Sequence, residues 1–316
     1  MPSHRFAATA AVLISVVVLG LAARGWRLPD SSAAVAPAST APPAGTSPAS
    51  IQPSGTAPGR HRTATGSAAA GRTNPTPTRH RISQQKLAAD LTALFGPGDS
   101  FSVAGYDVWS GRLVRAGATS GMTEASLVKL DILETALYRA QAGAGFDSDD
   151  AAAMMEQSDN VAADQLFADD GGNSGLQDYH AAAGGMASTA LDPNGTWGLS
   201  TTNAADQLQL LKQLVLPDSA LDAASRSQAL RLMGGVADDQ RWGVSAAADP
   251  GSTSELKNGW LNIDEDDGRW AVNSAGLTTV AGRPVLLVVL SQHQPDFQTG
   301  VSRVEAAAKQ LAAALA

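Results

Sequence analysis

Ser126 and Lys129, three residues apart, are the side chains in this sequence best suited to covalent chemistry. Leu130, Leu133 and Leu137 follow at the spacing of one apolar helix face, so we predict a helix that begins at Ser126. Side chains three apart lie on the same side of a helix, which brings the Lys129 amine within reach of the Ser126 hydroxyl. The start of a helix also favours negative charge on the serine oxygen. The pair therefore indicates a nucleophile with its own base.

Two further motifs support this interpretation, because a Ser-x-x-Lys pattern alone arises by chance about once in a chain of this length. Ser158–Asn160 reads Ser-Asp-Asn and follows a short helical run predicted over 151–157. Lys257–Gly259 reads Lys-Asn-Gly, lies in a strand-like segment and contains one of only five lysines. In this order the three motifs resemble the signature of the serine β-lactamases and penicillin-binding peptidases.

The order of the predicted elements is also similar to the class A β-lactamase catalytic domain. We expect an apolar strand over 101–108 with a Ser-Gly turn, strands from Lys257, over 269–276 and over 285–290, and a last helix over 301–315. The resemblance implies an α+β fold of the β-lactamase/DD-peptidase type: an antiparallel five-stranded sheet flanked by helices. The helical subdomain should be reduced, because the interval from Ser126 to Ser158 is short for this family and a wall of the cleft is expected to be missing.

The resemblance implies a catalytic role for four residues. Ser126 would attack a carbonyl group and Lys129 would take its proton, which requires a lysine made neutral by burial and by the neighbouring Lys257. Ser158 would relay the proton to the leaving nitrogen. Lys257 would pair its charge with a substrate carboxylate. The predicted chemistry is covalent acyl transfer.

Four further residues are predicted by the same resemblance to bind the substrate. Asn160 would hold the amide of the substrate's side chain, while Asp159 would brace the local backbone. The backbone N–H of Trp260 would complete an oxyanion hole with that of Ser126. Gly259 would let its strand approach the substrate closely. Asn258 replaces the family's usual hydroxyl residue and so weakens the contact to a substrate carboxylate.

The clearest departure from the family is the absence of any Glu between Glu156 and Glu255. Class A enzymes are expected to carry a loop Glu that activates the water for deacylation. The corresponding loop, 190–198, is turn-rich and offers only Asp192, which we interpret as a turn or capping residue rather than a base. Acylation should survive this loss, whereas fast deacylation should not.

The N-terminal quarter differs from the rest of the chain. Residues 6–23 are uncharged and long enough to span a bilayer core, so 1–27 is predicted to be a membrane anchor or a cleaved signal peptide. Residues 28–83 are rich in Ala, Pro, Ser and Thr and are predicted to form a disordered linker. Residues 84–316 are then the β-lactamase-like domain. The predicted location is extracytoplasmic, either membrane-anchored or secreted.

Composition excludes several other classes of site. Residues 1–83 hold eight Arg and one Asp, which leaves 14 basic and 29 acidic residues in 84–316, so nucleic-acid binding is not expected. The chain has no cysteine. Only His180 and His293 lie in the predicted domain; we interpret them as a helix-surface and a loop residue, not as triad members. Segment 262–268 resembles a calcium loop with misplaced ligands and is predicted to be a hairpin turn, with no metal or cofactor.

The sequence therefore predicts a serine hydrolase that is acylated at Ser126 by β-lactams or by acyl-D-Ala-like amides of peptidoglycan stem peptides. Two alternatives stay open. One is a D-Ala carboxypeptidase or esterase, and the other is a tethered sensor or pseudoenzyme that binds these ligands without turnover.

Overall fold

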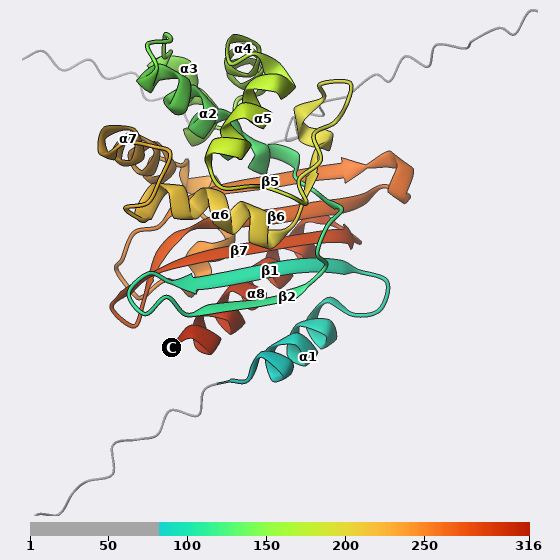
Figure 1. Cartoon of the computed structure of the whole chain (residues 1–316). Helices are drawn as coiled ribbons and strands as arrows, with labels where there is room; N and C mark the ends of the chain where they lie inside the picture. The colour runs from blue at the N-terminus through green and yellow to red at the C-terminus, as the bar shows by residue number, and fades with distance from the viewer. Residues whose placement is uncertain (1–81) are drawn as a thin grey trace, which may run out of the picture. The chain divides into compact units, whose positions relative to one another are not determined.

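A five-stranded antiparallel sheet in the order β2-β1-β7-β6-β5 is the centre of the fold (Figure 1). The computed structural model describes residues 82–316. The sheet strands are β1 (Ser100–Asp107), β2 (Leu113–Gly117), β5 (Glu255–Ile263), β6 (Arg269–Val280) and β7 (Arg283–Gln294), and a small second sheet pairs β3 (Met122–Thr123) with β4 (Thr201–Thr202). The predicted five-stranded antiparallel sheet is confirmed.

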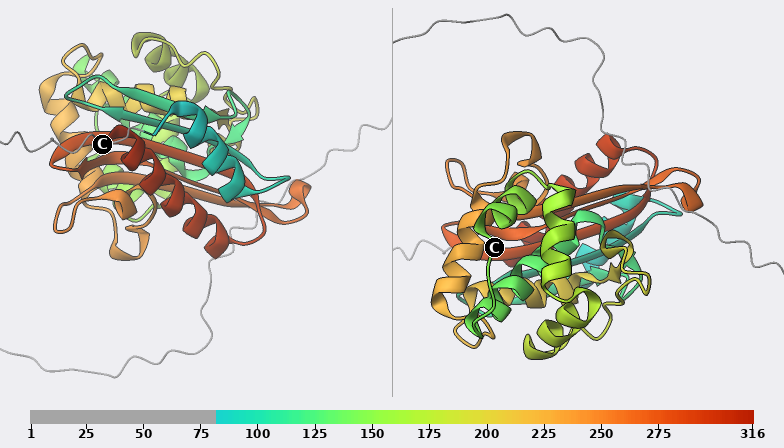
Figure 2. Two further views of the ribbon diagram at one scale, coloured as in Figure 1. Left: turned by 90° about the horizontal axis from the view of Figure 1, so that it is seen from below. Right: turned by 90° about the horizontal axis from the view of Figure 1, so that it is seen from above.

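Helices cover both faces of this sheet (Figure 2). Two of them, α1 (Gln84–Phe95) and α8 (Phe297–Leu315), lie side by side on one face. The others form a lobe on the opposite face: α2 (Lys129–Gln141), α3 (Ser148–Glu156), α4 (Asn160–Asp169), α5 (Gly172–Ala182), α6 (Ala204–Val215) and α7 (Ala223–Gly234). This is the predicted α+β arrangement of a sheet flanked by helices.

Strand alternation explains how one sheet serves two cores. On β7, Leu286, Val288 and Leu290 pack into the core shared with the helical lobe. Leu287 and Val289, which point to the other side, join the core beneath α1 and α8. All five side chains are fully buried. A strand buried on both faces reads as an apolar run, which is why the sequence predicted it over 285–290.

Capping residues set the helix boundaries more closely than apolar spacing does. Asp296 accepts a hydrogen bond from the backbone N–H of Thr299 at 2.8 Å, so α8 begins at Phe297, four residues before its predicted start. Asp159 caps α4 in the same way, with the N–H of Ala162 at 2.9 Å. The β5–β6 connection over 262–268 is a hairpin turn, as predicted.

The predicted membrane segment, 6–23, lies outside the described residues, as does almost all of the predicted linker. Within 82–316, no helix combines the length and the apolar character needed to cross a bilayer.

Candidate active site

Ser126 lies in a short 3₁₀ turn, Ala125–Val128, that leads directly into α2. The sequence prediction of a helix beginning at this serine is therefore close to the observed boundary. Ala125 has a φ of +52°, in the left-handed region that costs a residue with a side chain about 1–3 kcal/mol. Such strain persists only where the surrounding structure enforces it. The Ser126 side chain is half-buried, so the hydroxyl lies at the boundary between core and solvent.

Two sheet residues hold this turn in place. Asn273 on β6 donates from its amide nitrogen to the carbonyl oxygens of Thr123 at 2.8 Å and Glu124 at 3.0 Å. Gly259 on β5 lies against the turn so closely that a Cβ there would be 2.5 Å from the backbone nitrogen of Leu127. From the sequence, Gly259 was predicted to let its strand approach the substrate closely. Its nearest neighbour in the structure is the backbone of the turn itself.

The Ser158 hydroxyl is the point at which the three motifs meet. Its Oγ accepts hydrogen bonds from Lys129 Nζ at 3.2 Å and from Lys257 Nζ at 3.0 Å. A hydroxyl oxygen accepts at most two such bonds, so its own proton must point away from both lysines. Ser158 itself has a φ of +57°, a second strained residue at this site.

Lys129 is directed toward the Ser158–Asn160 segment. Its Nζ donates to the Ser158 backbone oxygen at 2.6 Å and to Asn160 Oδ1 at 2.6 Å, besides the Ser158 hydroxyl. These three bonds use all the hydrogens of an ammonium group. Among the hydrogen bonds of residues 82–316, none joins Lys129 Nζ to Ser126 Oγ. The contact that helical spacing predicted is therefore not made in this arrangement, although the two residues are one turn apart.

Burial dominates the electrostatics of the two lysines. Both side chains are fully buried, and neither forms a salt bridge within the described residues. Burial lowers the pKa of Lys129 to about 8, although the negative charges of Asp159 and Asp164 oppose this shift. Burial and the charge of Lys129 together lower the pKa of Lys257 well below its usual value. A neutral amine is therefore accessible at Lys129 near neutral pH.

The side chains of β5 divide between two faces. Lys257 points toward the helical lobe, where it reaches Ser158. Asn258, one residue on, is fully buried on the other side and donates to the backbone oxygens of Gln240 at 2.8 Å and Trp242 at 3.3 Å. The Trp260 ring also lies on that side, against Trp242 and Phe297. At the cleft, Asn258 and Trp260 can therefore offer only their backbone N–H and C=O groups.

The loop that should carry the deacylating carboxylate instead brings an aromatic ring to the site. Trp197 lies in a short turn, Trp197–Leu199, and its ring centroid is 5.1 Å from Lys129 Nζ. Asp192 accepts backbone hydrogen bonds from Asn194 at 3.1 Å and Thr196 at 3.0 Å. Asp192 is thus a turn residue, which is the role the sequence analysis favoured.

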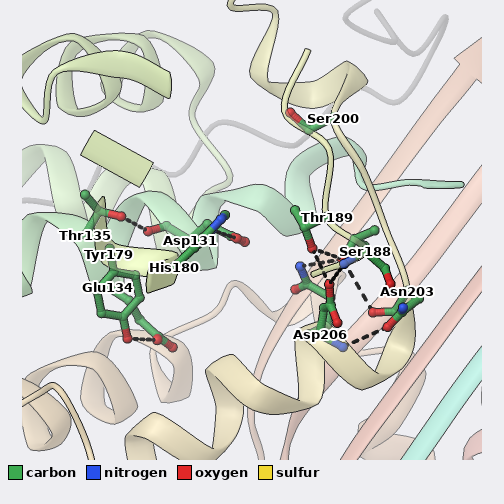
Figure 3. Close-up of polar contacts among 12 residues, drawn as sticks. Asp131, Glu134, Thr135, Tyr179, His180, Ser188, Thr189, Ser200, Asn203 and Asp206 are labelled. Carbon is green, nitrogen blue, oxygen red and sulfur yellow. Dashed lines mark hydrogen bonds and ion pairs between the residues drawn. The ribbon is translucent and has the colours of Figure 1, made fainter. Parts of the chain in front are cut away.

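Behind the nucleophile turn, α2 buries a row of carboxyl groups (Figure 3). Glu134 accepts from the Tyr179 hydroxyl, and Asp131 Oδ1 lies 2.9 Å from His180 Nε2. His180 is only 8% exposed, so its prediction as a helix-surface residue was wrong: the buried Asp131 opposite draws the ring inward. Glu124, beside the nucleophile turn, is also fully buried, and neither of its carboxyl oxygens has a hydrogen-bond partner. Burial and the charges of nearby carboxylates raise its pKa well above the usual value.

Sequence reasoning missed Asn273 and Trp197. The signal for Asn273 was present, since it is a polar residue in the middle of the buried strand β6. For Trp197 the sequence gives only its place in a turn-rich loop. Its position over Lys129 depends on packing between segments that are far apart along the chain.

Comparison with known proteins places this geometry in a family. The model of the β-lactamase enzyme family matches residues 148–315. The matched region contains Ser158 and Lys257 but begins after Ser126 and Lys129. No protein with a curated description matches the chain.

Solved structures of similar fold include penicillin-binding and β-lactamase proteins. A mutant of PBP-A, in an acyl-enzyme complex with penicillin G, has 17% identity and a TM-score of 0.63, and the match covers 73% of this chain and 95% of that one. A variant of the last common ancestor of the class A β-lactamases of Gram-negative bacteria has 21% identity and a TM-score of 0.60, covering 72% and 98%. A class A β-lactamase from Mycobacterium abscessus has 22% identity and a TM-score of 0.59, covering 71% and 97%.

Proposed function

Because the chain belongs to the β-lactamase enzyme family, we propose that it is an extracytoplasmic serine hydrolase acylated at Ser126 by β-lactams or by acyl-D-Ala-like amides. The observation that carries this proposal is that Lys129, three residues after Ser126, and Lys257 both donate hydrogen bonds to the Ser158 hydroxyl. The buried lysines supply a base and a second amine, and the Ser158 hydroxyl between them links the two.

In the proposed acylation, the Ser126 oxygen attacks the carbonyl carbon of the substrate as its proton passes to a neutral Lys129. The negative charge that develops on the carbonyl oxygen is stabilised by the backbone N–H groups of Ser126 and Trp260. The carbon–nitrogen bond then breaks, and Ser158 donates its proton to the leaving nitrogen. Lys129 replaces that proton through its hydrogen bond to Ser158 Oγ, so the relay returns to its starting state.

The Ser158 geometry suits this relay. Both acceptor positions of the hydroxyl oxygen are taken by lysines, so the donor position is free for the substrate. Lys257 would also pair with a substrate carboxylate, as in the sequence-based prediction, because the incoming negative charge favours the protonated amine. Asn160 keeps its amide N–H₂ for a substrate carbonyl, because its oxygen already accepts from Lys129.

Deacylation is proposed to be slow. Asp192, the one carboxylate in the loop that replaces the usual Glu, already accepts two backbone hydrogen bonds in its turn. Slow release would suit the alternative function, a membrane-tethered sensor that holds a β-lactam or stem peptide as a long-lived acyl-enzyme. A carboxypeptidase or esterase would need faster release through Lys129 and Ser158.

The full-length protein treated with a fluorescent penicillin and analysed by intact mass tests this proposal, with Ser126→Ala as the control. We expect one covalent adduct per chain in the wild type and none in Ser126→Ala. Failure to form any adduct, or an adduct that survives in Ser126→Ala, would contradict the proposed nucleophile.

The proposed location has its own test. Intact cells that express the protein are treated with the same fluorescent penicillin and then separated into membrane and soluble fractions. Labelled protein in the membrane fraction supports anchoring by residues 6–23, and labelled protein in the medium supports a cleaved signal. Labelling that requires prior cell lysis would contradict an extracytoplasmic domain.

A further inference from the structure

Trp197 connects the active-site lysine to a carboxylate on a separate helix. Its ring lies over Lys129, with the centroid 5.1 Å from Nζ. Its indole Nε1 donates to Asp164 Oδ1 on α4 at 2.7 Å. Asp164 is exposed, whereas Trp197 is half-buried and Lys129 is fully buried. The three side chains therefore contact one another in sequence, from Asp164 at the solvent through Trp197 to the buried Lys129.

The loop that carries Trp197 is anchored at both ends, and Figure 3 shows the contacts of Asp206 with Ser188 and Thr189 at its start. Asp206 on α6 accepts hydrogen bonds from the Ser188 backbone at 2.8 Å and the Thr189 hydroxyl at 3.0 Å. Ala190 and Thr201 then exchange backbone hydrogen bonds at 2.7 and 2.9 Å and close the loop. Side chains positioned by such closed surface loops are frequently functional.

The position of the ring bears on deacylation. In that step the oxygen of water attacks the carbonyl carbon of acyl-Ser126, a base takes the water's proton, and the bond to Ser126 Oγ breaks as that oxygen regains a proton. The water and the base must lie within hydrogen-bond distance of each other. An indole face has no lone pair to orient a water, and its N–H is already committed to Asp164.

We propose that Trp197, held by Asp164, covers Lys129 and keeps the deacylating water away from acyl-Ser126, so that the acyl-enzyme is long-lived. Trp197 and Asp164 are positioning residues in this scheme, and they select for ligand retention over turnover. The inference rests on the proposed acylation at Ser126.

Asp164 has a second effect, on the protonation of Lys129. Lys129 faces the carboxylates of Asp159 and Asp164 and the amine of Lys257. The charge of Asp164 favours the protonated amine, so Asp164→Asn should shift the midpoint of the acylation rate to lower pH. A change that merely loosened the fold would not move this midpoint in a defined direction.

The first experiment measures the lifetime of the fluorescent-penicillin adduct on full-length Trp197 variants after excess label is removed. We expect Trp197→Ala to shorten the lifetime about tenfold, because water reaches the acyl group. Trp197→Glu should shorten it about 100-fold, since a general base contributes at least that much. Trp109→Ala, a change of an exposed tryptophan in the β1–β2 turn, is the matched control and should leave the lifetime unchanged.

Unchanged lifetimes in both Trp197→Ala and Trp197→Glu, with acylation intact, would overturn the inference. Absence of any adduct in the wild type would instead overturn the proposed function, so the two failures are distinguishable.

A second experiment tests the role of the Trp197–Asp164 contact even if the Trp197 variants do not fold. Asp164→Asn retains an oxygen that accepts the indole N–H, whereas Asp164→Ala removes it. We expect the adduct on Asp164→Ala to be lost about fivefold faster than on Asp164→Asn, as for loss of one neutral hydrogen bond. Asp169→Asn, an exposed carboxylate on the same helix, should change neither the lifetime nor the pH midpoint. Equal lifetimes in Asp164→Ala and Asp164→Asn would contradict the inference.

Discussion

The two sides of the candidate cleft differ in the functional groups that they carry. On the side formed by α2, β5 and the segment before α4, two buried lysines share the Ser158 hydroxyl. On the side formed by loop 190–201, an indole ring lies over Lys129, and Asp192, the loop's one carboxylate, accepts backbone hydrogen bonds in a turn. Under the proposed function, acyl transfer and acyl release depend on separate structural elements, so one can be retained when the other is replaced.

The largest expected effect comes from removal of the proposed base. Lys129→Ala should lower the rate of acylation by about 10²–10⁴, the usual contribution of a general base. The rate is measured from the appearance of the penicillin adduct by intact mass. Lys212→Ala, which removes a partly buried lysine on α6, is the control and should keep the wild-type rate. Equal rates in the two variants would remove Lys129 from the mechanism.

The pH dependence of acylation sharpens the same point. Burial lowers the pKa of Lys129 to about 8, and the proposed base is the unprotonated amine. The acylation rate should therefore rise with pH, with a midpoint near 8, and should fall about tenfold for each pH unit below it. Rates of adduct formation measured from pH 5.5 to 9.5 provide the test. A flat profile over this range would show that Lys129 does not act as the titrating base.

The close packing of β5 against the nucleophile turn predicts a loss of stability. In Gly259→Ala, the new Cβ would lie 2.5 Å from the Leu127 nitrogen and 2.7 Å from the Glu124 oxygen. Such overpacking costs about 1–3 kcal/mol in the free energy of unfolding, measured by urea denaturation. The control is Gly145→Ala, where a Cβ meets no atom within 4 Å. Equal stability of the two variants would show that the turn moves freely away from β5.

The smallest expected effect concerns Glu124, whose buried carboxyl has no partner. Its pKa is raised in the folded state, so folding binds a proton more tightly and stability falls as pH rises above the unfolded value. Gln cannot ionise, so Glu124→Gln should be more stable than the wild type at pH 8 by about 1 kcal/mol. The gain should shrink at pH 5. Thermal unfolding at the two pH values checks this, and a Gln variant less stable at pH 8 would contradict it.

Much of the fold was accessible from the sequence because its signals are local. The apolar run over 285–290 and the Ser-Gly turn after 101–108 each correspond to an observed strand or turn. The motif residues were also recognisable, and the structure brings Lys129, Ser158 and Lys257 together.

The parts that the sequence did not predict depend on contacts between distant segments. From the sequence, His180 was interpreted as a helix-surface residue, whereas a hydrogen bond to Asp131, 49 residues away, holds it inside. The Trp197–Asp164 contact likewise joins residues 33 apart. No local pattern in the sequence predicts which loop side chain reaches a buried lysine.

The most direct test of the proposed mechanism is the ratio of the acylation rate to the deacylation rate in the full-length wild-type protein. Rapid mixing with a chromogenic cephalosporin separates the first turnover from the later ones. Fast acylation followed by slow deacylation predicts a burst of one equivalent of product per chain and then a much slower steady rate, with the burst absent in Ser126→Ala. A linear time course with fast turnover from the start would show that deacylation is efficient despite the indole over Lys129, and would contradict the proposed long-lived acyl-enzyme.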